Sequence, residues 1–273
     1  MASSRRHQSS DLGARVLAAI PAIIFAAIIV GYGGLVWALG VSFLGIVCLA
    51  ELYKLMGRVQ PANIAGFISV VALALAALYG DHFQIVIVLV ASIPLTFFFT
   101  LARPRREHAS WAAAVVLFGT LWIGMAMAHA VLLRELPHGG SLVLAVLIGT
   151  FLGDTAAYFG GRSFGRIPLA PALSPNKTLE GLACGVVGGT LALWAFLVGY
   201  HDWIGGVDAL VIGGAVALAA PLGDLFESLI KRDLDVKDTG GVFGPHGGVL
   251  DRLDGVFFSV PVAFYVALAL GLG

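Results

Sequence analysis

Residues 82–101 read HFQIVIVLVASIPLTFFFTL, and this apolar run decides the fold class of the chain. It contains no Asp, Glu, Lys or Arg, and it has the length of about 20 residues that a helix needs to cross the hydrocarbon core of a bilayer. The composition of all 273 residues agrees, because 59% are hydrophobic, 12% are charged and the mean hydropathy is +0.95. Soluble domains usually carry about 25% charged residues. We therefore expect an integral membrane protein.

Working outward from this run, we find eight further apolar stretches of similar length. The nine stretches are approximately 13–31, 33–56, 62–80, 82–101, 110–133, 141–160, 179–200, 208–230 and 255–272. Apart from two longer polar loops, 161–178 and 231–254, the connections between them are short, and no internal repeat is visible. The pattern predicts an all-α polytopic fold of about nine transmembrane helices, in which residues 1–273 form a single membrane domain behind a polar tail, 1–12. The 36 glycines suit close packing of helices within a bilayer.

The distribution of Lys and Arg predicts the orientation, because cytoplasmic loops carry the excess of positive charge. With nine crossings and a cytoplasmic N-terminus, fifteen of the sixteen basic residues fall inside, and only Arg134 falls outside. An even number of helices would destroy this separation. We therefore expect the loops 161–178 and 231–254 on the cytoplasmic side, the C-terminus outside and no removed signal peptide. The compact chain without targeting extensions favours a bacterial plasma membrane.

Charge and cysteine content exclude several classes of function. The formal net charge is zero and the pI is about 7.1, so we expect no nucleic-acid partner, and any phosphate binding must be local. Cys48 and Cys184 lie in separate apolar stretches and lack the spacing of a zinc site or a disulfide framework. We interpret both as packing residues.

The segment 224–254 concentrates eleven charged side chains in this apolar chain. Asp224, Glu227, Ser228 and Lys231 are spaced i, i+3, i+4 and i+7, which places them on one face of a helix. A solvated helix end with an ordinary Glu227–Lys231 pair is the simpler interpretation. Asp224 argues against it, because apolar residues surround it and charges at membrane depth usually serve a function.

A glycine-rich loop, 240–248, follows that helix and leads to Asp251, Arg252 and Asp254. Exposed backbone N–H groups of such loops bind phosphate, and the carboxylates suit Mg²⁺, which takes one or two protein carboxylates together with water and substrate phosphates. His246 is either an acid, base or phosphate donor, or a residue that orders the loop.

The stretch 154–181 supplies a third group of polar residues. Asp154, Tyr158 and Arg162 recur every four residues toward the cytoplasmic end of the 141–160 stretch. Pairing of Asp154 with Arg162 or with a neighbouring Lys is the structural alternative to a function. The following Ser-Pro-Asn-Lys-Thr sequence, 174–178, predicts a helix start, and a helix N-terminus beside Lys177 favours phosphate. His129, isolated in an apolar stretch, is expected to be a hydrogen-bonded packing residue.

Together these residues resemble the signature of phosphatidate cytidylyltransferases (CDP-diacylglycerol synthases). The resemblance covers roughly the C-terminal half and places the catalytic helices and cytoplasmic loops in 140–260, while residues 1–140 match only in hydropathy. It implies transfer of CMP from CTP to phosphatidate, which gives CDP-diacylglycerol and pyrophosphate, with Mg²⁺ and a second cation such as K⁺. Expected partners are CTP, phosphatidate and membrane lipids, with a homodimer as one arrangement that the sequence allows.

The resemblance also assigns roles to residues. The expected catalytic residues are Asp224, Lys231, His246, Asp251 and Arg252. The expected substrate-binding residues are Asp154, Arg162, Lys177, Ser228, Arg232, Lys237, Gly247 and Gly248. The expected metal ligands are Asp224, Asp251 and Asp254, with Asp154 as a further candidate. The alternatives are a lipid-alcohol kinase, a cytidylyltransferase for an ether lipid and, from another class, a cation or lipid transporter, which would need polar residues through both halves of the bilayer.

Overall fold

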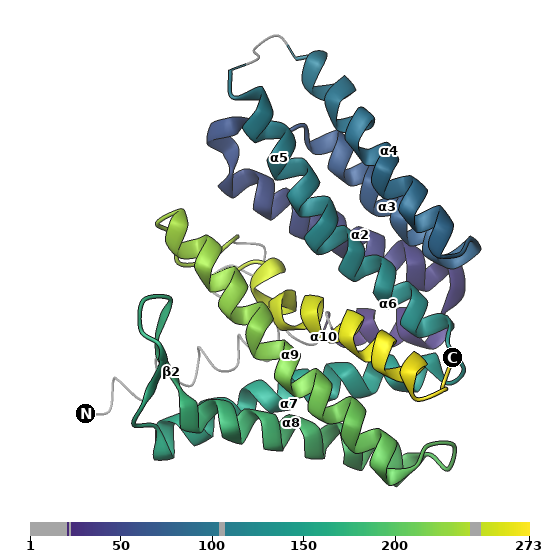
Figure 1. Cartoon of the computed structure of the whole chain (residues 1–273), viewed down its shortest axis with the longest axis vertical. Coiled ribbons are helices and arrows are strands. Elements are labelled where there is room, and N and C mark those ends of the chain that lie inside the picture. Colours follow the sequence, from purple (N-terminus) through teal and green to yellow (C-terminus); the bar gives the residue numbers. More distant parts are fainter. Residues whose placement is uncertain (1–20, 22, 104–106, 241–246) are drawn as a thin grey trace.

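The computed structural model describes residues 21, 23–103, 107–240 and 247–273, and it is almost entirely helical (Figure 1). The first helix that can be described spans Ile23–Tyr32. The others are α2 (Gly34–Leu55), α3 (Asn63–Tyr79), α4 (His82–Leu101), α5 (Ala109–Gly119), α6 (Met125–Glu135), α7 (Gly139–Phe164), α8 (Leu179–Tyr200), α9 (Gly206–Asp233) and α10 (Leu250–Ala269). A short 3₁₀ turn covers Gly57–Val59, and a π-helical turn, Thr120–Gly124, joins α5 to α6 in one continuous helix.

This architecture confirms the expected all-α polytopic membrane fold. Within the described residues, seven helices are long and apolar enough to cross a membrane, and the joined helix Ala109–Glu135 counts as one of them. The helices Ile23–Tyr32 and Asn63–Tyr79 are apolar but shorter. Each of the nine expected stretches therefore contains a helix, while the number of nine crossings stays a prediction.

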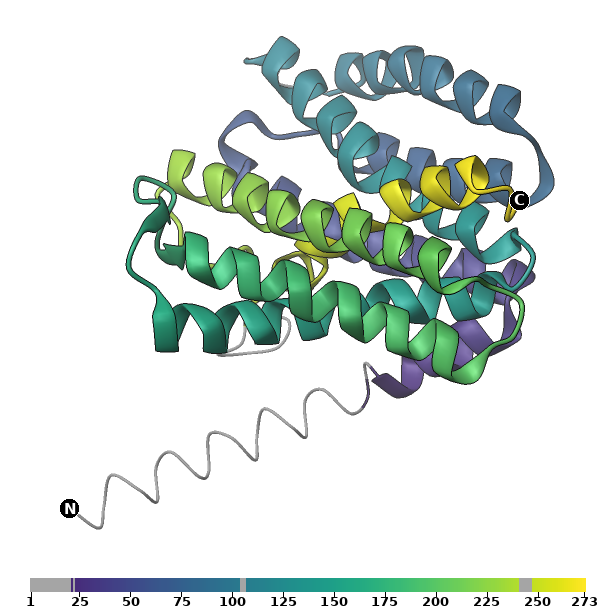
Figure 2. The same cartoon turned by 60° about the horizontal axis from the view of Figure 1, so that its bottom comes forward.

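The helices form two groups joined by a central pair. Figure 1 shows α3, α4 and α5 at one end of the molecule and α7 and α8 at the other, with α9 and α10 between them, and the turned view of Figure 2 keeps this order. α9 packs on both α8 and α10, and α10 also contacts α6 and α7. α9 and α10 therefore lie between the two groups.

Small residues set the closest of these helix contacts, as the abundance of glycine predicts. Gly149 and Gly153 of α7 face Gly185 and Gly189 of α8, and a Cβ at Gly153 would lie 3.3 Å from the Gly185 carbonyl oxygen. With no side chains between them, the two backbones approach closely. α7 and α8 thus form a tight pair against which α9 packs.

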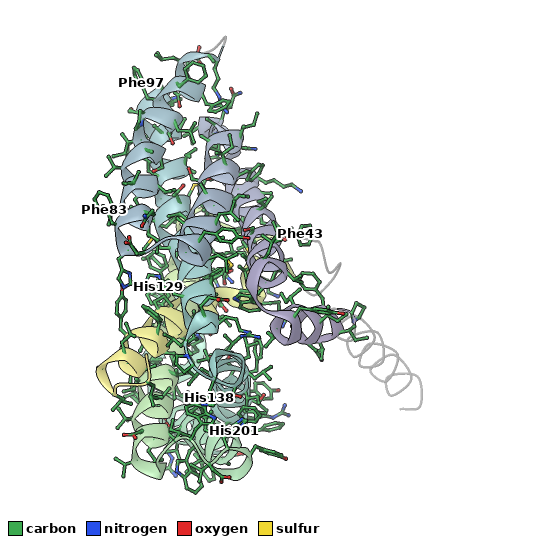
Figure 3. The ribbon with its side chains drawn as sticks, turned by 90° about the vertical axis from the view of Figure 1, so that its right-hand side faces the viewer. Phe43, Phe83, Phe97, His129, His138 and His201 are labelled. Carbon is green, nitrogen blue, oxygen red and sulfur yellow. The ribbon has the colours of Figure 1, made fainter. Side chains whose placement is uncertain are left out.

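Apolar side chains also cover the outside of the molecule, as expected for a surface that faces lipid. Phe43, Phe83 and Phe97 point outward from their helices (Figure 3), with exposed fractions of 58%, 66% and 61%. Cys48 lies in the core and Cys184 packs beside Gly160. Both cysteines are packing residues, as predicted.

The loop 161–178 contains an element that the sequence did not predict. β1 (Pro168–Ala170) and β2 (Ser174–Thr178) form an antiparallel hairpin in which Ala170 pairs with Ser174. The predicted helix start is confirmed, because the Thr178 side chain accepts a hydrogen bond from Gly181 N–H and caps α8. The hairpin therefore projects directly from the start of α8.

Candidate active site

One face of α9 carries the polar side chains that the sequence placed together. Ser228 Oγ donates to Asp224 Oδ1 at 3.5 Å, and Lys231 Nζ lies 2.5 Å from Glu227 Oε2. The pair Glu227–Lys231 predicted by the simpler interpretation thus forms, but it is not a solvated pair. The Glu227 side chain is 1% exposed and that of Lys231 is 15% exposed. Two opposite charges in so little water need further partners.

Asp251 in the first turn of α10 is that further partner. Its Oδ1 lies 2.9 Å from Lys231 Nζ, so Lys231 bridges Glu227 on its own helix and Asp251 on the next. Its Oδ2 accepts three hydrogen bonds, from Thr239 N–H and Thr239 Oγ1 at 2.9 Å each and from Gly248 N–H at 2.7 Å. Asp251 is therefore held on both oxygens.

The two glycines before α10 fit closely around this carboxylate. Gly247 has a φ of +81°, which is the left-handed region that glycine adopts at low cost, and a Cβ there would lie 2.7 Å from Asp251 Oδ2. Gly248 is buried, and its N–H points at Asp251. In this structure the two glycines, which were expected to bind substrate phosphate, shape the surroundings of Asp251.

More carboxylates lie beside this network. The Asp224 carboxylate forms an ion pair with Lys177, which comes from β2 just before α8. Asp154 of α7 interacts electrostatically with both Asp224 and Lys177. Residues from α7, β2 and α9, which the sequence treated as separate motifs, therefore meet at one place.

Asp254 connects the two halves of this cluster. It interacts electrostatically with Asp224 and Lys231, and its carboxyl group lies within hydrogen-bonding reach of the Glu227 carboxyl group. A tight helix contact brings it there, because a Cβ at Gly223 would overlap the backbone carbonyl of Asp254. α9 and α10 thus touch through their backbones at the position that precedes Asp224. We name Asp154, Asp224, Glu227, Asp251 and Asp254, together with Lys177 and Lys231, the carboxylate–lysine cluster.

The arginines and Lys237 that were expected in the site are exposed. Arg162 is exposed and donates to the Tyr158 hydroxyl at 3.0 Å, so the alternative Asp154–Arg162 pair is not the contact that Arg162 makes here. Arg232 Nε donates to the Leu173 carbonyl in the hairpin at 3.0 Å. Lys237 and Arg252 are exposed. His246 lies outside the described residues.

Glu51 of α2 is a buried acidic residue that no sequence motif singled out. Its carboxylate is 5% exposed and accepts hydrogen bonds from Val249 N–H at 3.1 Å and Leu250 N–H at 2.8 Å. Glu51 is an acidic residue within an expected membrane-spanning stretch, and such a residue requires a buried partner. This rule could have singled it out, although no rule of spacing could have named a partner 199 positions away.

A divalent cation fits the cluster in charge and in ligand type. Within the described residues, five acidic side chains surround two lysines. Glu227 is buried, Asp224, Asp251 and Asp254 are half-buried, and Asp154 is exposed. Carboxylate oxygens are the ligand type that a hard divalent cation prefers. No three ligand groups among the described residues stand in a metal-binding arrangement. In this structure Lys177 pairs with Asp224 and Lys231 pairs with Asp251.

His129 is a packing residue, as expected. Its ring nitrogens lie 2.8 Å from the Met125 carbonyl oxygen and 3.1 Å from the Tyr265 hydroxyl. Figure 3 shows it well separated from His138 and His201, which lie near each other at the far end of the molecule. The histidine therefore joins α6 to α10 through hydrogen bonds and has no part in the carboxylate–lysine cluster.

Comparison with known proteins connects this geometry to one family. The model of the cytidylyltransferase family matches residues 13–270. A phosphatidate cytidylyltransferase of Mycobacterium leprae is 39% identical over 60% of this chain, and the match covers 52% of that protein. The chain thus spans about half the length of the mycobacterial relatives that it matches. Two other proteins with that name match almost end to end. The protein of Staphylococcus epidermidis is 31% identical over 91% of this chain and 96% of its own, and that of Bacillus subtilis is 28% identical over 94% and 97%.

Proposed function

Because the chain belongs to the cytidylyltransferase family, we propose that it transfers CMP from CTP to phosphatidate, giving CDP-diacylglycerol and pyrophosphate. The observation that carries this proposal is the bridge from Glu227 through Lys231 to Asp251, buried between two membrane helices in the region of the expected signature. A reaction between two polyanions needs fixed positive charge and a cation. The carboxylate–lysine cluster offers both a cationic side chain and candidate cation ligands.

The reaction that follows is a displacement at the α-phosphorus of CTP. A phosphate oxygen of phosphatidate forms the new P–O bond while the bond to the β-phosphate bridging oxygen breaks, and that electron pair leaves with pyrophosphate. The attacking oxygen is already ionised near neutral pH, so no strong general base is needed. The task of the protein is to position the reactants and offset their charge.

We assign these tasks to residues as follows. Lys177 and Lys231, the cations inside the cluster, would offset charge on the triphosphate or the lipid phosphate. Arg232, Lys237 and Arg252 lie on the exposed side, where a nucleotide can approach. Lys177 and Lys231 each pair with a carboxylate in this structure, so binding of phosphate requires these pairs to loosen.

Mg²⁺ would be held by Asp224 and Asp251, with Asp254 and Asp154 next, and would supply positive charge to the phosphates of CTP. A second cation such as K⁺ would fit the remaining carboxylates. Both assignments rest on charge and ligand type. Thr239 and Gly248 donate hydrogen bonds to Asp251 Oδ2. This carboxylate oxygen is therefore held in place without substrate.

The proposal includes a location. CTP is a cytoplasmic metabolite, so the active site would face the cytoplasm of a bacterial plasma membrane, with the N-terminus on the same side and nine crossings. Phosphatidate would enter sideways from the surrounding lipid. A homodimer is compatible with this arrangement.

The first experiment is an assay of the purified full chain in mixed micelles with phosphatidate, labelled CTP and Mg²⁺. Lipid-bound CMP and pyrophosphate should form in equal amounts, and EDTA should abolish both. Asp251→Asn should lower turnover by about 100-fold or more, since it removes a fixed charge in a site of low dielectric. The matched control is Asp202→Asn, an exposed residue between α8 and α9, which should behave as wild type.

The same assay separates the alternatives. Transfer of phosphate from CTP to a lipid alcohol, without release of pyrophosphate, would replace the proposal by a lipid kinase. A preference for an ether-linked substrate would narrow it to an ether lipid. Folded protein that makes no product with any of these lipids and cations would refute the transferase proposal and favour transport.

A further inference from the structure

Glu51 places a negative charge deep in the N-terminal half of the protein. It lies in the last turns of α2, with 5% of its surface exposed, after a run of apolar residues. A buried carboxylate is stable only when hydrogen-bond donors or cations satisfy it. Here each oxygen has one backbone donor, since Oε1 accepts from Val249 N–H and Oε2 from Leu250 N–H.

These donors are the N–H groups at the start of α10. The first N–H groups of a helix have no acceptor within the helix, and a carboxylate at this end is also favoured by the helix dipole. Val249 is the N-cap residue of α10, and it makes no side-chain capping bond. Glu51 therefore supplies from a distant helix the cap that the local sequence lacks.

Two glycines of the loop 240–248 lie against the Glu51 carboxylate. A Cβ at Gly240 or at Gly248 would overlap atoms of the Glu51 carboxylate group. Both glycines belong to the loop that was expected to bind phosphate. Contact with Glu51 gives a separate reason for the absence of side chains at these two positions.

The same few residues hold Asp251. Gly248 donates its N–H to Asp251 Oδ2, while the next two N–H groups along the chain point to Glu51. Asp251 Oδ1 continues to Lys231 and from there to Glu227. The backbone of residues 248–250 thus joins the hydrogen bonds of Glu51 to those of Asp251, and a shift of the α10 N-terminus would move Asp251.

We propose that Glu51 is a positioning residue for the transfer reaction, which holds the N-terminus of α10 so that Asp251 stays aligned with Lys231. The inference rests on the proposed function for its kinetic consequence. Its structural part stands on the two hydrogen bonds and the packing alone. The family model begins at residue 13, so the resemblance is not limited to hydropathy in the N-terminal half, as the sequence suggested, and Glu51 gives that half a defined part in the site.

The test compares Glu51→Gln with Ser42→Ala. Gln has nearly the same shape but keeps only one acceptor oxygen and no charge, whereas Ser42 is a buried α2 residue whose hydroxyl bonds within its own helix. Glu51→Gln should lower kcat about tenfold, the range found when a group that orients a ligand is removed. It should also speed amide exchange at Val249 and Leu250 but not in α8. Ser42→Ala should change neither.

A second variant tests whether Glu51 acts through Asp251. Thr239→Val removes one hydroxyl bond to Asp251 Oδ2 while Glu51 stays in place. If both residues position the same carboxylate, the double variant loses less kcat than the product of the single losses. If the kcat loss of the double variant equals the product of the two single losses, the proposal is overturned. It is also overturned if amide exchange at Val249 and Leu250 is the same in the Glu51→Gln and Ser42→Ala proteins.

The two proposals can fail separately. A wild-type protein without transferase activity would refute the proposed function, while the amide-exchange comparison would still decide whether Glu51 holds α10. An active wild type with Glu51→Gln at full kcat would refute the role of Glu51 and leave the function intact.

Discussion

Lys231 Nζ of α9 lies 2.9 Å from Asp251 Oδ1 of α10, and this ion pair joins the two helices at their polar ends. The same nitrogen lies 2.5 Å from Glu227 Oε2. One cation therefore offsets two carboxylates that are almost without solvent. Loss of Lys231 would leave both charges unpaired in a setting where water cannot replace it.

We expect Lys231→Met to destabilise the protein by about 3–5 kcal/mol, the cost of removing one member of a buried ion pair, and to abolish turnover. Met fills a similar volume, so packing is largely kept. Unfolding by denaturant in micelles and the CMP-transfer assay measure the two effects. The control is Lys54→Met, which removes an exposed lysine near the end of α2. Equal free energies of unfolding for the two variants would show that the ion pairs of Lys231 do not stabilise the fold.

Gly223 gives a second prediction, on helix spacing. A Cβ there would overlap the Asp254 carbonyl, so Gly223→Ala should push α9 from α10 and lower both stability and turnover. Gly214 lies on the same helix, and a Cβ there would meet nothing within 4 Å. Gly214→Ala should be neutral or stabilise by up to about 1 kcal/mol through helix propensity.

Paired unfolding and activity measurements decide between the two sites. Similar behaviour of the two alanine variants would mean that the backbone contact at Asp254 does not control the spacing of α9 and α10. Retained stability with lost turnover at Gly223→Ala would assign the effect to the alignment of Asp224 and Asp254.

Local patterns in the sequence predicted much of the fold and part of the site. Apolar length located the helices, and the spacing i, i+3, i+4, i+7 placed Asp224, Glu227, Ser228 and Lys231 on one face, as the structure has them. The Thr178 cap of α8 followed from its residue type. These features depend on a few neighbouring residues, so the sequence contains all that they need.

Features that depend on distant residues were not predicted. The Glu51 cap of α10 joins positions 199 apart, and the pairing of Lys177 with Asp224 depends on how β2 meets α9. The hairpin in 161–178 was missed because its strands have three and five residues, too short for an alternating pattern. The roles of the metal-ligand candidates and of Lys237, Arg252 and His246 stay predictions.

Arg232 leads to a third prediction, because it was expected to bind substrate and here holds the hairpin. Its Nε donates to the Leu173 carbonyl, which lies between β1 and β2. Arg232→Ala should release the hairpin and make residues 171–173 more sensitive to proteinase K. The control is Asp233→Ala, the exposed neighbour on the same helix end. Unchanged cleavage in both variants would show that Arg232 does not hold the hairpin, and binding of substrate would remain its expected role.

The orientation of the chain can be tested at the two ends of α8, because the hairpin precedes this helix and Asp202 follows it. In a background in which Cys48 and Cys184 are replaced by alanine, Ala172→Cys and Asp202→Cys each introduce one thiol at an exposed position. The excess of Lys and Arg predicts that the hairpin is cytoplasmic. A membrane-impermeant maleimide should therefore label the Asp202→Cys protein in intact cells and the Ala172→Cys protein only after the membrane is opened. The opposite result would reverse the orientation and place the carboxylate–lysine cluster on the side of the membrane that lacks CTP, so the same experiment bears directly on the proposed reaction.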